Sequence, residues 1–511
     1  MKSLTRATRI LDNVRLSQSC KNITGFRNMA NIKAQYKKAI TFENLNPNIV
    51  RLEYAVRGPL YLRVLEIEQE LKDGVEKPFN KVIKANAGDA QAMGQIPISF
   101  IRQVLVCVSY PEMIETSNFS KDVKERAREI LDACVGNSIG SYSIAVGIES
   151  IRKSVANFIE KRDGYKANWR DICLTAGASA GIKNCLELLI NDIEGKPSGV
   201  MIPIPQYPLY SASLAEYGLK QVDYYLDESK NWALTIEELD RALLDGSKDC
   251  KVRALVVINP GNPTGQVLTR DNIENIIKFA YKHSLMIFAD EVYQQNIFEG
   301  EFHSFKKVLV ELGAPYNQVE VVSFMSTSKG FMGECGLRGG WMEIVNMEPK
   351  VQANLYKCMS AKLCASTLGQ AVVDCVARPP QEGDASYEQY VQERDNVLES
   401  LNIRAKMIEE LFNNMEGFRC NVVQGAMYAF PRIELSGKAI EAAKKAGQEP
   451  DVFYAFRLLE ATGICVVPGS GFGQEPGTYH FRTTILPQMD LLREMVDSFQ
   501  KFHQKFTQEF S

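Results

Sequence analysis

The stretch from residue 165 to residue 345 alternates short apolar, β-branched runs with longer stretches of helical period. This pattern constrains the fold most, because a sheet of parallel strands crossed by helices requires such an order. Near-continuous apolar runs are typical of strands that are buried on both faces. The runs predict strands at residues 172–175, 200–204, 222–226, 254–258, 285–289 and 319–324. We therefore predict an α/β fold whose large, doubly wound domain has a mostly parallel sheet.

The helical stretches and the loop composition predict the domain boundaries. Apolar residues at 273, 276, 277, 280 and 281 form a stripe on one helix face. Thr235 and Glu238 have the spacing of a capping box that opens another helix. Residues 379–386 are rich in Pro, Gly and acids and mark the exit from the large domain. We expect a large domain over 111–378 and a smaller α/β domain built from the N-terminal segment 35–110 and the C-terminal segment 379–511.

Residues 1–28 have the composition of a targeting segment. They carry six basic residues against a single acid, Asp12, with several Ser and Thr between them. Such a composition is typical of a mitochondrial transit peptide, and a disordered basic tail is the alternative interpretation. Met29 could serve as a second start that gives a shorter form. We therefore expect the mitochondrial matrix, with a cytoplasmic form as the alternative.

Charge and composition favour a small-molecule partner. The formal net charge of −3 and the lack of a long basic block argue against a general nucleic-acid binder. The apolar runs are far shorter than the ~20 residues that a membrane span needs, so no membrane is expected. The twelve cysteines include no C-x-x-C pair, and the four histidines have no H-E-x-x-H spacing. We expect reduced thiols and no metal site.

Polar residues follow the predicted strands at the edge where open α/β sheets bind ligands. They comprise the small-residue turn 177–181 after the first strand, Asn262 after the fourth, Asp290 and Tyr293 after the fifth, and Ser326 and Lys329 after the sixth. Arg338 comes nine residues after Lys329.

Each of these features has a chemical and a structural interpretation. The turn at 177–181 lets backbone N–H groups approach an anion, with Ser179, Ser326 and Arg338 as further donors, but tight packing alone would also explain it. Asp290 would need a cationic or N–H partner if buried, and it could instead cap a turn. Lys329 could be a solvated surface lysine. In a crevice, its neutral amine is the nucleophile that combines with aldehydes.

Four of these blocks together resemble the fold-type I pyridoxal-phosphate-dependent aminotransferase family. They are residues 205–210 (Pro-Gln-Tyr-Pro-Leu-Tyr), 259–266 (Asn-Pro-Gly-Asn-Pro-Thr-Gly-Gln), 289–293 (Ala-Asp-Glu-Val-Tyr) and 326–330 (Ser-Thr-Ser-Lys-Gly). They occur in the family's order and at its spacing, and the resemblance covers roughly residues 40–505. The spacing of nine between Lys329 and Arg338 departs from the aspartate aminotransferase pattern, which has eight.

The resemblance implies a role for each matching residue toward pyridoxal phosphate. Lys329 resembles the catalytic lysine that binds the cofactor covalently, and Asp290 the carboxylate that keeps the pyridine nitrogen protonated. Asn262 and Tyr293 resemble the pair that binds the ring oxygen, and Tyr207 the aromatic side chain stacked on the ring. The residues that match the phosphate site are Ala178, Ser179, Ser326 and Arg338.

The resemblance also implies a substrate site and a homodimer. Arg482 resembles the arginine that binds the substrate carboxylate, Gly88 lines the same site, and Asn262 lies beside it. Tyr142 resembles the tyrosine that family members lend to the phosphate site of the neighbouring subunit.

The implied reaction is the reversible ping-pong transfer of an amino group from L-alanine to 2-oxoglutarate, giving pyruvate and L-glutamate. The choice of these substrates, an amino acid and a 2-oxo acid, rests on the resemblance alone. Alternatives are another aminotransferase or a lyase on the same scaffold, and a non-catalytic regulatory protein with this fold. A nicotinamide dehydrogenase is disfavoured, because the glycine-rich run 469–473 is not G-x-G-x-x-G and lies late in the chain.

Overall fold

The computed structural model describes residues 38–54 and 58–511. The expected transit peptide at 1–28 and the second start at Met29 lie outside the described residues. Residues up to Val50 form one unit, which holds the 3-10 turn Phe42–Asn44 and most of the short helix α1 (Pro47–Arg51). The sheets and the site belong to the other unit, Arg51–Ser511.

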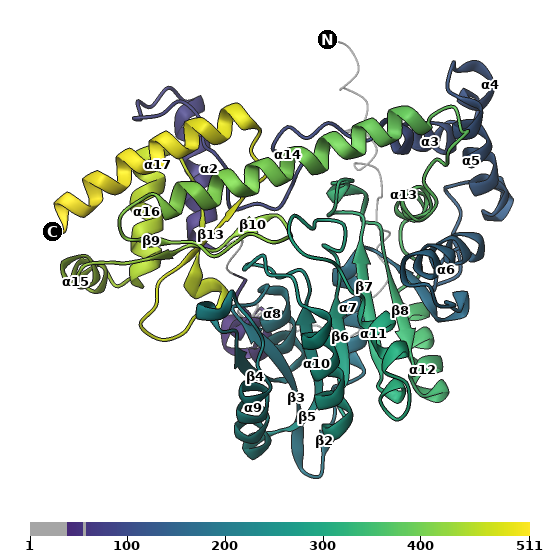
Figure 1. The fold of residues 1–511 in the computed structure, drawn as a ribbon, viewed down its shortest axis with the longest axis horizontal. Helices are drawn as coiled ribbons and strands as arrows, with labels where there is room; N and C mark the ends of the chain where they lie inside the picture. Colours follow the sequence, from purple (N-terminus) through teal and green to yellow (C-terminus); the bar gives the residue numbers. More distant parts are fainter. Residues whose placement is uncertain (1–37, 55–57) are drawn as a thin grey trace, which may run out of the picture. The chain divides into compact units, whose positions relative to one another are not determined.

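The large sheet is built as the alternating sequence pattern predicts (Figure 1). Within the described residues it has eight strands in the order β1-β8-β7-β6-β5-β3-β2, with β4 also paired to β3. The pairs β3–β4, β3–β5, β5–β6 and β6–β7 are parallel, whereas β8 runs antiparallel to both β1 and β7. The strands are β1 (Ile172–Thr175), β2 (Asp192–Ile193), β3 (Lys196–Ile204), β4 (Lys220–Tyr225), β5 (Lys251–Ile258), β6 (Met286–Asp290), β7 (Val321–Ser326) and β8 (Gly340–Val345).

The predicted α/β fold with a mostly parallel sheet is confirmed, and each of the six predicted strands is present. Strand β8 was not among the predicted strands, although it lies between β1 and β7. Its apolar run is interrupted by Glu343, which is buried and forms an ion pair with Lys306 of α11. A buried ion pair between distant segments leaves no pattern in the local sequence.

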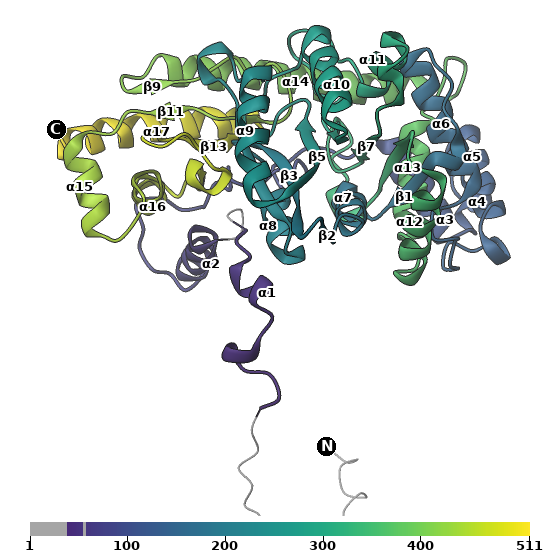
Figure 2. The same cartoon turned by 90° about the horizontal axis from the view of Figure 1, so that it is seen from below.

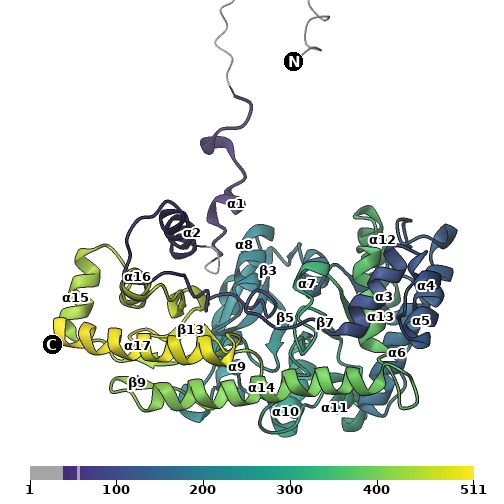
Figure 3. The ribbon, with the colours of Figure 1, turned by 90° about the horizontal axis from the view of Figure 1, so that it is seen from above.

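Helices cover both faces of this sheet (Figures 2 and 3). Val257 of β5 packs in the same apolar cluster as Ile276 of α10, whereas its neighbour Val256 packs with Ile182 of α7. One face carries α9 (Ile236–Asp249), α10 (Arg270–His283) and α11 (Phe305–Leu312), and the other carries α7 (Ala178–Glu187), α8 (Leu209–Tyr217) and α12 (Pro349–Ala361). A third cluster packs Leu174 and Trp341 of β1 and β8 against further helices. These are α3 (Ser99–Ser109), α5 (Lys121–Asp132), α6 (Glu149–Asp163) and α13 (Thr367–Ala377), with the short α4 (Met113–Thr116) beside them.

Two local predictions on these helices are only partly right. The apolar stripe of α10 is buried at four of its positions, but Tyr281 is 42% exposed and sets its ring edge-on against Tyr316. Thr235 caps α9 by accepting a hydrogen bond from the Glu238 N–H. The Glu238 carboxylate accepts a hydrogen bond from the backbone N–H of Tyr225, so it ties α9 to the end of β4.

The C-terminal part of the chain forms two small sheets and a group of helices. The small sheets are β10-β13-β12 and β11-β9. The strands are β9 (Phe418–Arg419), β10 (Tyr428–Ala429), β11 (Arg432–Ile433), β12 (Val467–Pro468) and β13 (Phe481–Thr484). The helices are α14 (Tyr387–Asn413), α15 (Gly437–Lys445), α16 (Pro450–Thr462) and α17 (Met489–Glu509). Helix α2 (Pro59–Lys72), from the N-terminal region, packs against α16. The long helix α14 contacts α3 and also α17, so it connects the two parts of the chain (Figure 3).

A segment from the N-terminal region joins the small sheets. Ile83 forms a parallel bridge with Ile464, and the Cys465 N–H donates to the Ile83 carbonyl at 2.9 Å. The Thr484 N–H of β13 donates to the Ala85 carbonyl, also at 2.9 Å. These bonds fix the chain just before Asn86 and Gly88. The predicted division into domains at 110 and 378 remains a prediction.

The sequence-based expectations about membrane spans and cysteines can be compared with the described residues. In that part of the chain no helix is long and apolar enough to cross a membrane. The eleven cysteines that the structure describes are all free thiols.

Candidate active site

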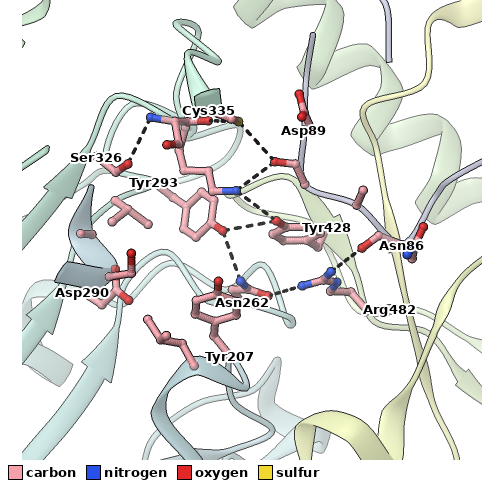
Figure 4. A pocket seen from close by; sticks show the side chains of 18 of the residues that line it. Asn86, Asp89, Tyr207, Asn262, Asp290, Tyr293, Ser326, Cys335, Tyr428 and Arg482 are labelled. Carbon is pink, nitrogen blue, oxygen red and sulfur yellow. Dashed lines mark hydrogen bonds between the residues drawn. The ribbon is translucent and has the colours of Figure 1, made fainter. Parts of the chain in front are cut away.

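A cavity of about 600 Å³ lies at the carboxyl ends of the central strands (Figure 4). Eleven of the twelve site residues predicted from sequence line it: Gly88, Ala178, Ser179, Tyr207, Asn262, Asp290, Tyr293, Ser326, Lys329, Arg338 and Arg482. They come from seven separate segments of the chain, so the fold alone brings them together. Tyr142 is not among the residues that line the cavity, and its side chain is 74% exposed.

Lys329 lies in the loop that follows β7 and lines the cavity. Its Nζ donates a hydrogen bond to the Gly88 carbonyl at 3.0 Å and to the Tyr428 hydroxyl at 3.5 Å. The same nitrogen lies 5.8 Å from the centre of the Tyr293 ring. The amine is therefore held by oxygen atoms that arrive from the N-terminal segment and from the small sheet.

Asp290 ends strand β6 and is only 3% exposed. The Tyr210 hydroxyl donates to its Oδ2 at 2.8 Å, whereas Oδ1 has no hydrogen-bond partner among the described residues. Burial raises the pKa of Asp290 to about 6, although the Tyr210 hydrogen bond, the Val292 N–H and the charge of Lys329 oppose the rise. A buried carboxylate oxygen without a donor is costly, so this atom is suited to an N–H group of a ligand.

Arg482 lies in β13 and is only 2% exposed. It donates to the Asn86 carbonyl at 2.6 Å and to Asn262 Oδ1 at 3.2 Å, while its Nε has no partner within residues 38–54 and 58–511. Its guanidinium lies 4.2 Å from the centre of the Tyr428 ring and 4.9 Å from that of Phe472. In the described chain no carboxylate pairs with this buried cation, so it is suited to an anionic ligand.

Asn262 and Tyr293 connect Arg482 to the rest of the site. The Asn262 side-chain amide donates to the Tyr293 hydroxyl at 3.2 Å, and this hydroxyl donates to that of Tyr428 at 3.5 Å. Burial and the neighbouring Tyr428 raise the pKa of Tyr293 well above its ordinary value. Tyr293 therefore keeps its proton and acts as a donor.

Several hydrogen-bond donors line the part of the cavity at the start of helix α7. Arg338 donates to the hydroxyls of Ser179 at 3.2 Å and Ser328 at 3.4 Å. The first N–H groups of a helix have no partner within it, and Ala178 and Ser179, the first two residues of α7, line the same cavity. Ser326 Oγ accepts a hydrogen bond from the Ser328 N–H at 3.1 Å and also lines the cavity. Together these groups could bind an anion such as a phosphate.

Gly177 makes the close approach of Arg338 possible. Its φ of +79° belongs to the region that glycine adopts without strain, and a Cβ there would lie 2.4 Å from Arg338 Nη2. The spacing of nine residues from Lys329 is compatible with this contact, because Arg338 itself has a φ of +54° and turns back toward α7.

Five residues that the sequence did not single out also take part in the site. The first is Tyr54, whose hydroxyl shares a hydrogen bond of 3.0 Å with that of Tyr207. Burial raises the pKa of Tyr207 well above its ordinary value. The others are Asn86, Tyr210, Ser328 and Tyr428. Tyr210 and Ser328 fall within quoted blocks and could have been found there. Asn86 and Tyr428 lie in short segments without a motif, and only the pairing of distant strands brings them in.

No cluster of metal-ligating side chains occurs among the described residues.

Comparison with known proteins identifies the family. A family model described as "Aminotransferase class I and II" matches residues 109–499. Alanine aminotransferase 1 of Homo sapiens is 53% identical over 492 residues, which cover 96% of this chain and 99% of the relative. Alanine aminotransferase 2 of Panicum miliaceum is 47% identical over 479 residues, which cover 92% of this chain and 99% of the relative.

Solved structures share the fold. An alanine aminotransferase from Pyrococcus furiosus superposes with a TM-score of 0.71 at 24% identity, covering 90% of this chain and 99% of that one. An aspartate aminotransferase from Thermotoga maritima does so with a TM-score of 0.67 at 19% identity, covering 90% and 100%. Given the match of the family model and the high identity to these relatives, the chain belongs to the class I and II aminotransferases and is a pyridoxal-phosphate-dependent enzyme of fold type I.

Proposed function

We propose that this enzyme is an alanine aminotransferase that moves the amino group of L-alanine reversibly to 2-oxoglutarate by a ping-pong mechanism. Pyruvate and L-glutamate are the products. The substrate choice is supported by relatives named alanine aminotransferases at 47% and 53% identity over more than nine-tenths of the chain. The observation that carries the reaction type is that Lys329, Asp290 and Arg482 line one cavity.

The residues around the cavity fit pyridoxal phosphate. Asp290 Oδ1, which lacks a donor within the described chain, would accept a hydrogen bond from a protonated ring nitrogen. Ala178, Ser179, Ser326 and Arg338 would hold the phosphate at the start of α7, where the helix dipole favours an anion. When bound, the cofactor supplies an electron sink for the charge that remains once the α-proton has been removed.

Three side chains would orient the ring. Asn262 Nδ2 and Tyr293 Oη, which lie 3.2 Å apart, would share the ring oxygen as a ligand. Tyr207 would provide the aromatic face on which the ring stacks. Asp290 would keep a proton on the ring nitrogen, because its carboxylate is buried and one of its oxygens has no donor within the described residues.

Arg482 would bind the substrate carboxylate. Its planar guanidinium can form two parallel hydrogen bonds to a carboxylate, which fixes the orientation of the substrate as well as its charge. The guanidinium is held in place by its hydrogen bonds to Asn262 Oδ1 at 3.2 Å and to the Asn86 carbonyl at 2.6 Å. Gly88 would line the substrate site. A larger residue at this position would collide with the Tyr428 hydroxyl.

Lys329 would carry the proton. Its amine, once free, takes the α-proton of the bound substrate, and the Gly88 carbonyl orients it through the hydrogen bond of 3.0 Å. A lysine amine suits this step because it can act first as a nucleophile and then as a base.

Initial-rate kinetics with purified enzyme would test the proposal. Varying L-alanine at several fixed concentrations of 2-oxoglutarate should give parallel double-reciprocal lines, as ping-pong kinetics require. L-Alanine should have a higher kcat/KM than L-aspartate, L-tyrosine and other donors, and Lys329→Ala should abolish turnover. A clearly higher kcat/KM with another amino acid would contradict alanine as the substrate. Repeated turnover without any 2-oxo acid acceptor, beyond one product per active site, would indicate a lyase.

We also propose that the enzyme is a homodimer in which Tyr142 serves the phosphate site of the partner. The exposed position of Tyr142 and its place outside the cavity of its own chain support this. Mixing the inactive Lys329→Ala variant with Tyr142→Phe, under conditions that allow subunit exchange, should raise activity above the sum of the two. A hybrid would then hold one site that carries neither change. No gain on mixing, with exchange verified, would contradict the shared site.

We further propose that residues 1–28 direct the enzyme to the mitochondrial matrix, and that initiation at Met29 gives a cytoplasmic form. The basic, acid-poor composition supports this. Fluorescent fusions of the full chain and of the chain that begins at Met29 should show mitochondrial and diffuse fluorescence, respectively. Diffuse fluorescence of both would contradict the proposal.

A further inference from the structure

Tyr428 is a site residue to which neither the sequence motifs nor the proposed mechanism gives a role. It lies in β10, opposite Thr484 of β13, and is only 2% exposed. Its ring packs against the Arg482 guanidinium at 4.2 Å (Figure 4). Its hydroxyl accepts a hydrogen bond from Lys329 Nζ at 3.5 Å. The side chain therefore spans the distance between the carboxylate-binding arginine and the catalytic lysine.

A continuous chain of hydrogen bonds runs through the Tyr428 hydroxyl. Arg482 donates to Asn262, Asn262 donates to Tyr293, and Tyr293 donates to Tyr428, at 3.2, 3.2 and 3.5 Å. From the other side Lys329 donates to the same oxygen at 3.5 Å. Two donors thus converge on one phenolic oxygen.

The charges around Tyr428 favour an electron-rich oxygen. Burial raises the pKa of Tyr428, but the cations Lys329 and Arg482, together with the hydrogen bonds from Tyr293 and Lys329, outweigh burial and lower it below its ordinary value. Tyr207 is the further titratable group that interacts with it electrostatically. Since Tyr293 keeps its proton, it is the donor in the hydrogen bond between the two tyrosines, and the Tyr428 oxygen is the acceptor.

Packing keeps Tyr428, Lys329 and the N-terminal segment close together. A Cβ on Gly88 would lie 2.0 Å from the Tyr428 hydroxyl oxygen and 3.0 Å from Lys329 Nζ. Such distances are shorter than van der Waals contact, so the hydroxyl can hold its place only with glycine at position 88.

We propose that Tyr428 is a positioning residue, which holds the ε-amine of Lys329 and couples its protonation to carboxylate binding at Arg482. The inference rests on the proposed function. A carboxylate bound at Arg482 compensates one of the two cations beside Tyr428, so the ionised Tyr428 hydroxyl takes up a proton more readily. Once the Lys329 amine is free, a proton moves from its ammonium form to the Tyr428 phenolate oxygen. The N–H bond breaks, the O–H bond forms, and the neutral amine is ready to take the α-proton.

The half-reaction with L-alanine, without any 2-oxo acid, gives the first test on the holoenzyme. Tyr428→Phe should slow it roughly tenfold to a hundredfold, because the amine loses its orientation. The deuterium isotope effect with α-deuterated alanine should increase, whereas the dissociation constant of alanine should change little, since Arg482 keeps Asn262 and Asn86. An unchanged rate and an unchanged isotope effect would contradict the inference.

Tyr224→Phe is a matched control for this variant. Tyr224 is equally buried, and its hydroxyl donates to the Val256 carbonyl at 2.7 Å, outside the cavity. Its loss should lower the melting temperature without altering the isotope effect. If both variants change the isotope effect alike, a general loss of stability explains the result and the inference fails.

A titration without turnover gives the second test. In the full-length chain stripped of cofactor, the phenolate absorbance of wild type minus that of Tyr428→Phe should show a tyrosine that ionises below the usual pKa of ~10. Propionate, which is alanine without its amine, should move this ionisation to higher pH by occupying Arg482, and neutral propionamide should not. No shift with propionate at saturation would contradict the coupling. This result is independent of the substrate, whereas a wild type that fails to react with alanine would contradict the proposed function.

Gly88→Ala gives a second route to the same displacement. It should slow the half-reaction as Tyr428→Phe does, because the new methyl group pushes the hydroxyl away from Lys329. In the Tyr428→Phe background, Gly88→Ala should slow the half-reaction less. Without the hydroxyl, the new Cβ would lie 3.0 Å from the nearest ring atom instead of 2.0 Å from the oxygen. Strictly additive losses would contradict the proposed link between Gly88 and Tyr428.

Discussion

At the scale of single residues, the site holds two buried charged side chains that the protein leaves partly unpaired. Asp290 has a free carboxylate oxygen and Arg482 a free guanidinium nitrogen, both without partners in the described chain. Burying a charge without a counter-charge is costly, and proteins accept this cost where a ligand supplies the missing partner. Both side chains are therefore positions where substitution should affect ligand binding more than folding.

The carboxylate of Asp290 predicts a pH-dependent effect of the cofactor on stability. Its pKa is raised from 3.8 to about 6, so the contribution of Asp290 to the stability of the stripped protein is fully present below pH 3.8 and is lost as pH rises through about 6. A protonated ring nitrogen would compensate the ionised carboxylate. The difference in melting temperature between loaded and stripped enzyme should therefore grow as pH rises through this range. Asp290→Asn should bind cofactor without this growth, and an equal pH dependence in both proteins would contradict the assigned partner.

The guanidinium of Arg482 predicts a change in substrate affinity. Arg482→Lys replaces a planar pair of donors by a point charge, so kcat/KM for L-alanine should fall roughly tenfold to a hundredfold, equivalent to ~1.5–3 kcal/mol. Most of the change should appear in KM, with the cofactor spectrum unaltered. Arg457→Lys, in an exposed pair with Glu509, is the control and should behave as wild type. An unchanged KM in Arg482→Lys would contradict the carboxylate site.

At the scale of secondary-structure elements, a buried polar group holds the strand that carries Asp290. Glu291, the next residue, accepts hydrogen bonds from the Phe305 N–H at 2.8 Å and from the Ser323 hydroxyl. It thereby connects β6 to β7 and to the start of α11. Burial raises its pKa to about 7, although Arg162 opposes the rise.

Glu291→Gln should flatten the pH dependence of folding. The contribution of the wild-type side chain is fully present below pH 4.5 and is lost as pH rises through about 7, by up to ~3 kcal/mol. Denaturant unfolding across this range should show that loss in wild type and a smaller one in the variant. Glu237→Gln, exposed in the first turn of α9, is the control and should retain the wild-type slope. Equal slopes in Glu291→Gln and wild type would contradict the assigned titration.

Elements with a local pattern could be predicted from the sequence. The six parallel strands and the stripe of α10 follow from runs and periods within a dozen residues. Strand β8 could not be predicted in this way, because its buried Glu343 is compensated by Lys306, which is distant in the sequence. Tyr281 fits the period of α10, but its ring packs edge-on against Tyr316 instead of entering the core. The side chain therefore stays partly exposed.

At the scale of the whole molecule, the site forms where the large sheet meets the small sheets. The large sheet contributes Lys329 and Asp290, and the small sheet contributes Arg482 and Tyr428. Gly88 comes from a segment that pairs with residues almost four hundred positions later, through Ile83 and Ile464. Strands of two residues carry no periodicity of their own, so the sequence could predict the large-sheet half of the site in detail but not Asn86 or Tyr428.

A ligand that fills the cavity should stabilise the folded chain. Saturating pyridoxal phosphate at ~1,000 times its dissociation constant should add about 4 kcal/mol to the free energy of unfolding, because it binds only the folded state. Lys329→Ala should retain part of this gain through the phosphate site. A melting temperature that does not respond to the cofactor would contradict a cofactor site in this cavity.

The half-reaction of purified enzyme with L-alanine alone tests the central claim most directly. In the absence of any 2-oxo acid, we predict that alanine removes the absorbance band of the lysine-bound cofactor and yields one pyruvate per active site, and that 2-oxoglutarate restores the band and releases glutamate. Lys329→Ala should do neither. A band that persists in excess alanine, with no pyruvate formed, would contradict the account.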